Sequence, residues 1–166
     1  MKRLLLILVV LLFLLPVCGC KKSAETISNP ANFYYRSSST EFFTDDSVIK
    51  PEIRETQQCG ENILNIIHLY FQGPISDDYT TPFPQELVAL EVEQNNESLL
   101  IKLNDSFANL NGVDRTLACS CILKTVADLT NCSTVELQFP SPNSDQSNSI
   151  QLSLDDLCFI DLDSSN

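Results

Sequence analysis

The spacing of apolar residues predicts two helices in the chain. In residues 61–72 the apolar positions recur at helical spacing, and Gly73 and Pro74 end the helix near Gln72. In residues 113–129 the apolar positions cover more than half of the helical surface. We therefore expect the second helix to be more deeply buried than the first.

Alternating apolar and polar residues predict strands around these helices. Val88, Leu90 and Val92 alternate with Ala89 and two glutamates, and residues 99–103 alternate in the same way. Residues 94–97 lie between these runs and tolerate positive φ, which predicts an antiparallel hairpin. Further strands are expected over residues 33–36, 48–55, 134–139 and 150–154. Loops are expected over residues 75–85, 104–112 and 141–149.

This order of elements predicts one α+β domain. Strands paired by a hairpin and interleaved with two helices favour a two-layer sandwich, in which both helices pack on one face of a mixed, mostly antiparallel sheet. Pro51 makes the strand over residues 48–55 an edge strand, because proline cannot donate a ladder hydrogen bond. We expect the domain to span residues 32–163, with the tail after residue 140 as its least regular part.

The first residues of the chain have the pattern of an export signal. Lys2 and Arg3 precede an unbroken apolar run over residues 4–15, which is too short to cross a bilayer as a mature helix. Val17-Cys18-Gly19-Cys20 follows and resembles the lipobox of bacterial lipoproteins. The resemblance implies that residues 1–19 are a signal peptide and that Cys20 becomes acylated, with palmitate or a related chain.

A lipidated Cys20 predicts a protein held at the cell membrane, on its extracytoplasmic face. Its partner there would be membrane lipid, reached through the acyl anchor. Residues 20–31 are polar and would form a flexible linker between the anchor and the domain. The alternative is an ordinary cleaved secretory signal with an incidental cysteine.

The net charge argues against nucleic acid as a partner. The whole chain carries −12, and without residues 1–19 it has 8 basic and 22 acidic residues, a net charge of −14. Nucleic acids and anionic lipid surfaces attract lysine and arginine. Lys21 and Lys22 are the exceptions, beside the expected anchor.

The cysteines after Cys20 are odd in number. They are Cys59, Cys119, Cys121, Cys132 and Cys158. Cys119 and Cys121 are two positions apart in a helical pattern and point to different faces, which disfavours a bond between them. We favour buried free thiols, and the alternative is one disulfide among Cys59, Cys132 and Cys158.

Residue patterns that support catalysis or metal binding are weak in this chain. His68 is the single histidine, and no Gly-x-Ser-x-Gly motif accompanies it. Cys119 and Cys121 cannot direct two thiolates at one zinc ion while they lie in a helix. The paired aspartates, such as Asp77-Asp78, lack the order of a calcium loop. We expect no enzyme activity and no cofactor, with weak calcium binding and a glycosidase-like carboxylate pair as alternatives.

The order of elements also resembles the GerMN domain, a module of sporulation and spore germination found in lipoproteins of Gram-positive bacteria. The matching runs are residues 69–74, 82–84, 99–107, 117–126 and 135–137. The resemblance covers residues 32–140 and departs after Phe139, where residues 140–149 replace the family's acidic-glycine turn. It implies a compact α+β domain without catalytic residues.

We therefore predict a non-catalytic lipoprotein that serves as an interaction or assembly module of the cell envelope, linked to sporulation or germination. Its partners would be envelope proteins or copies of itself. The alternative is a lipoprotein that binds a small ligand or a cell-wall fragment in a pocket between helix and sheet. An exposed apolar strip on residues 48–55 would favour the first function, and a pocket with convergent polar groups would favour the second.

Overall fold

The computed structural model describes residues 29–38, 48–141 and 146–156. The strands are β1 (Ala31–Ser37), β2 (Ile49–Arg54), β3 (Tyr79–Thr80), β4 (Ala89–Asn95), β5 (Ser98–Leu103), β6 (Thr134–Pro140) and β7 (Ser147–Ser153). The helices are α2 (Ile63–Phe71) and α3 (Gly112–Thr130), with short 3₁₀ turns η1 (Gln57–Cys59), η2 (Asp105–Asn109) and η3 (Leu154–Asp156). Cys20, the predicted signal peptide and Cys158 lie outside the described residues.

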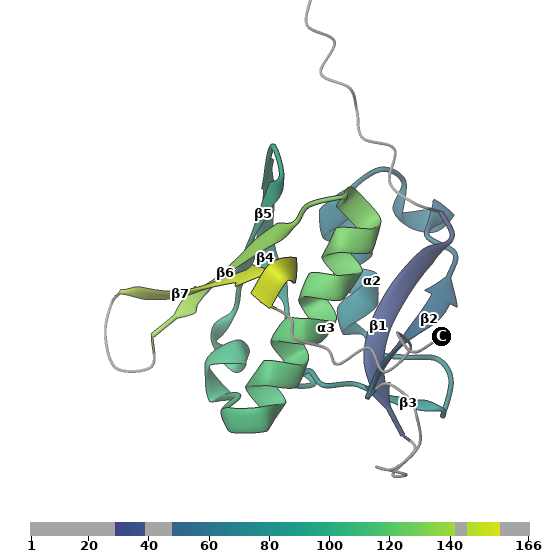
Figure 1. Ribbon diagram of the computed structural model, residues 1–166, viewed down its shortest axis with the longest axis horizontal. Helices are drawn as coiled ribbons and strands as arrows, with labels where there is room; N and C mark the ends of the chain where they lie inside the picture. The colour runs from purple at the N-terminus through teal and green to yellow at the C-terminus, as the bar shows by residue number, and fades with distance from the viewer. Residues whose placement is uncertain (1–28, 39–47, 142–145, 157–166) are drawn as a thin grey trace, which may run out of the picture.

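The strands form two sheets, and the helices lie between them (Figure 1). The first sheet has the order β2-β1-β3, and all its pairs are antiparallel. The second has the order β4-β5-β6-β7, and only its β5–β6 pair is parallel. The predicted α+β class with mostly antiparallel pairing is confirmed. The strands divide into two sheets because α3 packs against β1 on one side and β6 on the other.

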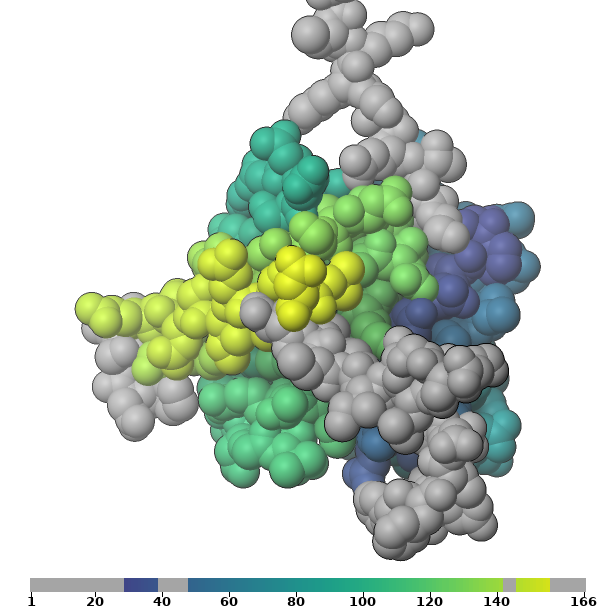
Figure 2. Space-filling model, viewed as in Figure 1, coloured from purple at the N-terminus to yellow at the C-terminus, as the bar shows by residue number. Residues whose placement is uncertain are grey.

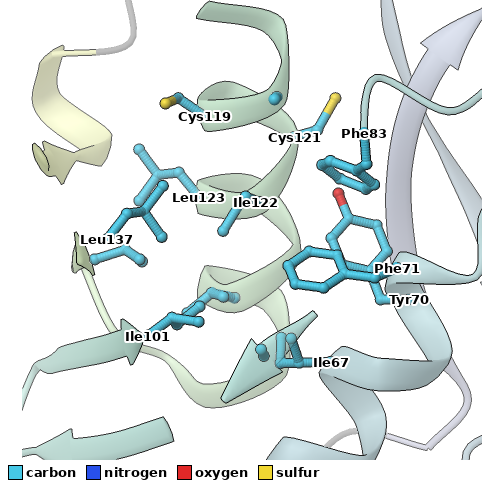
Figure 3. Packing of buried hydrophobic residues seen from close by; sticks show 14 of the residues in the cluster. Ile67, Tyr70, Phe71, Phe83, Ile101, Cys119, Cys121, Ile122, Leu123 and Leu137 are labelled. Atoms are coloured by element: carbon cyan, nitrogen blue, oxygen red, sulfur yellow. The ribbon is translucent and has the colours of Figure 1, made fainter. Parts of the chain in front are cut away.

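Helix α3 is buried around most of its circumference. Residues 118–123 are six consecutive buried positions, which a helix resting on one sheet could not provide. In Figure 3, Cys119 and Leu123 lie on the side of α3 that faces Leu137 of β6, while Cys121 lies on the opposite side, the side of Phe83. The deep burial that the sequence predicts for this helix is confirmed, and its cause is the second sheet.

Helix α2 lies within the predicted range of residues 61–72: it begins two residues later and ends one residue earlier. The side chain of Asn62 caps its first turn by accepting hydrogen bonds from the backbone amides of Leu64 and Asn65. At the other end Gly73 adopts a φ of +89°, which an L side chain rarely takes. Tyr70 and Phe71 then pack against Phe83, with ring centroids 5.0 Å apart in each pair.

The edge of β1 that faces away from β2 is completed by two side chains. In the described part of the chain, β3 pairs with Arg36 and Ser37 at the far end of β1. At Tyr34 the backbone amide donates to Thr125 Oγ1 over 2.9 Å, and the backbone oxygen accepts from the Tyr70 hydroxyl over 2.7 Å. Side chains of α3 and α2 thus satisfy backbone groups that a neighbouring strand would otherwise pair.

The hairpin of β4 and β5 forms as predicted, but the residues that β4 buries differ from the prediction. Asn96 turns the chain with a φ of 53°, as the residue pattern indicates. A register shift between Ala89 and Glu91 then reverses the alternation. Ala89 is buried, whereas Val88 and Leu90 are exposed, so the apolar face expected from Val88, Leu90 and Val92 is wrong at its start.

Two predicted loops contain strands. β3 lies inside the expected loop over residues 75–85, and β7 begins at Ser147, inside the expected loop over residues 141–149. β3 is too short to show alternation, and the first half of β7 is polar on both faces. Among the described residues, neither helix combines the length and apolar composition that crossing a bilayer requires. The buried hydrophobic residues begin at Ala31, so a chain that starts at Ser23 keeps the whole described core.

Candidate functional site

A groove of about 320 Å³ runs between the first half of α3 and the edge strand β7. Among the described residues β6 is the one strand neighbour of β7, and the β6–β7 hairpin projects from the body of the domain (Figure 2). The lining of the groove is mostly apolar with a few polar groups, as in small-molecule sites. The lining residues are Gly112, Arg115, Thr116, Cys119, Ser120, Leu123, Ile150, Gln151, Leu152 and Ser153.

Arg115 supplies the positive charge of this groove. Its Nη2 donates to the backbone oxygen of Ala108 over 3.1 Å, and its guanidinium carbon lies 5.9 Å from the centre of the Phe139 ring. Its Nε is buried and has no acceptor among the described residues. No carboxylate of the described chain pairs with this guanidinium, although the protein is strongly acidic.

Cys119 lines the same groove as a protonated thiol. Burial raises its pKa to about 11, and the nearby charge of Arg115 only partly opposes this effect. Burial likewise raises the pKa of Cys121 to about 12. Because the thiolate is the nucleophilic form, neither cysteine is prepared for covalent chemistry at neutral pH. Cys59, Cys119, Cys121 and Cys132 are free thiols in the structure.

The other residues that the sequence suggested for catalysis or metal binding either make structural contacts or do not converge on one site. His68 Nε2 lies 2.7 Å from the backbone oxygen of Ala89, so this nitrogen carries the proton and holds α2 to β4. Cys119 and Cys121 point to opposite sides of α3 (Figure 3). Within the described residues, no group of three or more His, Cys, Asp or Glu side chains converges as a metal site would require.

A second surface feature lies at the outer margin of the first sheet. Ile53 on β2 is 69% exposed and Ile75 is 76% exposed. The backbone of Ile75 lies beside β2, because the buried carboxylate of Glu52, the residue before Ile53, accepts hydrogen bonds from the backbone amides of Ile75 and Ser76, over 2.9 and 2.8 Å. We call Ile53 and Ile75 the β2 margin. β2 is an edge strand, as Pro51 predicts.

Sequence reasoning missed Arg115 and Glu52. Neither lies in a motif, and each acquires its role from a distant partner that spacing along the chain does not reveal. One sign was present for Arg115: it interrupts the apolar pattern of a helix expected to be mostly buried.

Comparisons with known proteins give one structural similarity. No protein-family model matches the chain, and no curated protein matches it. The fold is similar to a crystal structure from Clostridium perfringens of a protein provisionally described as a lipoprotein, with 16% identity and a TM-score of 0.46. The match covers 79% of this chain and 95% of that one. The resemblance to the GerMN domain stays a prediction.

Proposed function

We propose that this protein is a membrane-anchored, non-catalytic lipoprotein that acts as an interaction module of the cell envelope. Cys20 carries the acyl anchor, and the polar residues after it link it to the α+β domain, whose first strand begins at Ala31. Envelope proteins or other copies of the chain bind to the domain surface. The GerMN-like order of elements supports a place in sporulation or germination.

The observation that carries this proposal is the β2 margin. Two isoleucines, each more than two-thirds exposed, lie at one edge of an otherwise acidic protein. Burying such side chains against a partner gains roughly 1.5–3 kcal/mol each before the costs of association. Pro51 removes a backbone donor from the same edge, which favours recognition through side chains over the addition of a strand.

The anchor is tested by metabolic labelling with a palmitate analogue. The wild-type chain should incorporate label and fractionate with membranes, and Cys20→Ala should lose both properties. Cys18→Ala is the matched control and should remain labelled, because Val17 is a poor residue before a lipidated cysteine. A Cys20→Ala protein that stays labelled and membrane-bound would contradict the anchor.

The interaction surface is tested with a photo-crosslinking amino acid in cells. The photo-crosslinking amino acid replaces Ile53 in one variant and Leu90 in the other. Leu90 is the control position, because it is similarly exposed but lies on the other sheet. A discrete crosslinked species should form from position 53, disappear when Ile75→Glu is added, and be absent from position 90. Equal crosslinking from both positions, or none from position 53, would refute this surface.

A further inference from the structure

We propose that the groove between α3 and β7 binds a small amphipathic carboxylate, whose charged group meets Arg115 and whose apolar body lies against Leu123, Ile150 and Leu152. This ligand site is separate from the β2 margin, because the groove is built from α3 and the second sheet, whereas the margin belongs to the first.

The charge of the groove selects an anion. Arg115 is half-buried, and its one hydrogen bond within the described residues goes to a neutral backbone oxygen. A partly desolvated guanidinium without a carboxylate partner is costly, and a ligand carboxylate matches its planar donors. Arg54 and Lys102, by contrast, already pair with carboxylates of the described chain, Glu52 and Glu91.

The apolar lining and the volume select the rest of the ligand. Ile150 and Leu152 face α3 from an edge strand and remain half-buried, so an apolar body would complete their burial. A volume of 320 Å³ divided by the roughly 30 Å³ of a water-sized group corresponds to about ten non-hydrogen atoms. A single positive charge in this lining suits a carboxylate monoanion better than a phosphate dianion.

Binding in this groove is non-covalent. Cys119 lines it with a protonated thiol, so the groove offers shape and charge without a nucleophile. Ser153 also lines the groove, and its hydroxyl, which accepts from the Asp155 amide, keeps its own proton available for a ligand.

Octanoate is the test probe, because it has about ten non-hydrogen atoms, and octanamide is its neutral analogue of the same size. The chain from Ser23 to Asn166 is titrated with each compound by calorimetry, and the Nε–H resonance of Arg115 is followed by NMR. We expect octanoate to bind at least about tenfold more tightly than octanamide and to shift that resonance. Equal affinity for the two compounds would overturn the proposal.

Two arginine variants separate the groove from non-specific attraction. Arg115→Gln should weaken octanoate by about tenfold and remove its advantage over octanamide. Arg36→Gln, at an exposed arginine of β1, should bind both compounds as the wild type does. Unchanged binding to a folded Arg115→Gln protein would refute the assignment. If octanoate binds only to a chain that ends at Asp156, the protein's own C-terminal residues occupy the groove. That result would also overturn the proposal.

Discussion

Replacing Thr125 with valine tests how the open edge of β1 is held. Thr125 is fully buried in α3, and its Oγ1 accepts the backbone N–H of Tyr34, 91 residues earlier in the chain, over 2.9 Å. Valine has the same shape and leaves no cavity. The substitution removes the hydroxyl that accepts from the Tyr34 amide and that also interacts with the Tyr70 hydroxyl, and it leaves the Tyr34 amide without a partner.

The structure sets the expected size of this effect. An unsatisfied buried donor costs about 1–3 kcal/mol, and the contact is only partly buried at Tyr34, which places the loss near 1–2 kcal/mol. For a domain of this size the loss corresponds to a fall in Tm of about 3–8 °C. The free energy of unfolding should decrease, while the urea m-value should stay unchanged.

Urea unfolding followed by circular dichroism measures this loss. Thr116→Val is the control in the same helix, because the Thr116 hydroxyl is exposed and donates to its own helix at Gly112 over 3.2 Å; its stability should stay within about 0.5 kcal/mol of the wild type. Tyr70→Phe removes the matching bond to the Tyr34 oxygen, and its effect should be non-additive with Thr125→Val. A Thr125→Val protein as stable as the Thr116→Val control would refute this account of the strand edge.

Three further results follow from buried polar groups. Glu52→Gln removes a charge that accepts two backbone amides, so urea unfolding should show a loss of about 1–3 kcal/mol. In the native protein a thiol reagent should modify half-buried Cys59 readily and Cys119 much more slowly, because burial raises the Cys119 pKa to about 11 and leaves little thiolate at neutral pH. Burial also raises the pKa of Tyr70 well above its usual value, so the unfolded chain loses this proton first and stability should fall as the pH rises above about 10, with the tyrosinate absorbance appearing together with unfolding.

Local chemistry explains which elements the sequence predicted correctly. Gly73 and Pro74 end α2, and the Asn96 turn forms its hairpin, because each depends on backbone preferences of adjacent residues. The extent of burial in α3 was also readable, since a nearly all-round apolar pattern requires cover on several sides. No residue pattern indicated that this cover would be a second sheet.

Long-range pairing explains what the sequence did not reveal. β3 is two residues long and exists because Arg36 and Ser37 offer partners more than forty positions away. The bulge after Ala89 exchanges the buried and exposed positions at the start of β4. The alternation of apolar and polar residues along the chain does not reveal such a shift. The groove also depends on long-range pairing, because Arg115 of α3 and the residues of β7 that share the groove are separated in the chain by β6. Its charge was visible in the sequence, but its neighbours were not.

The hydrogen bond between Tyr34 and Thr125 can form only after most of the chain has been synthesised. β1 is made first, yet the side chain that completes its edge is added 91 residues later. At about 5–20 residues per second, the ribosome needs roughly 5–18 seconds to supply it. Throughout that interval the strand carries the apolar side chains of Phe33 and Tyr35 without their final cover. A chaperone that binds this early segment would therefore meet apolar side chains that α3 has not yet covered.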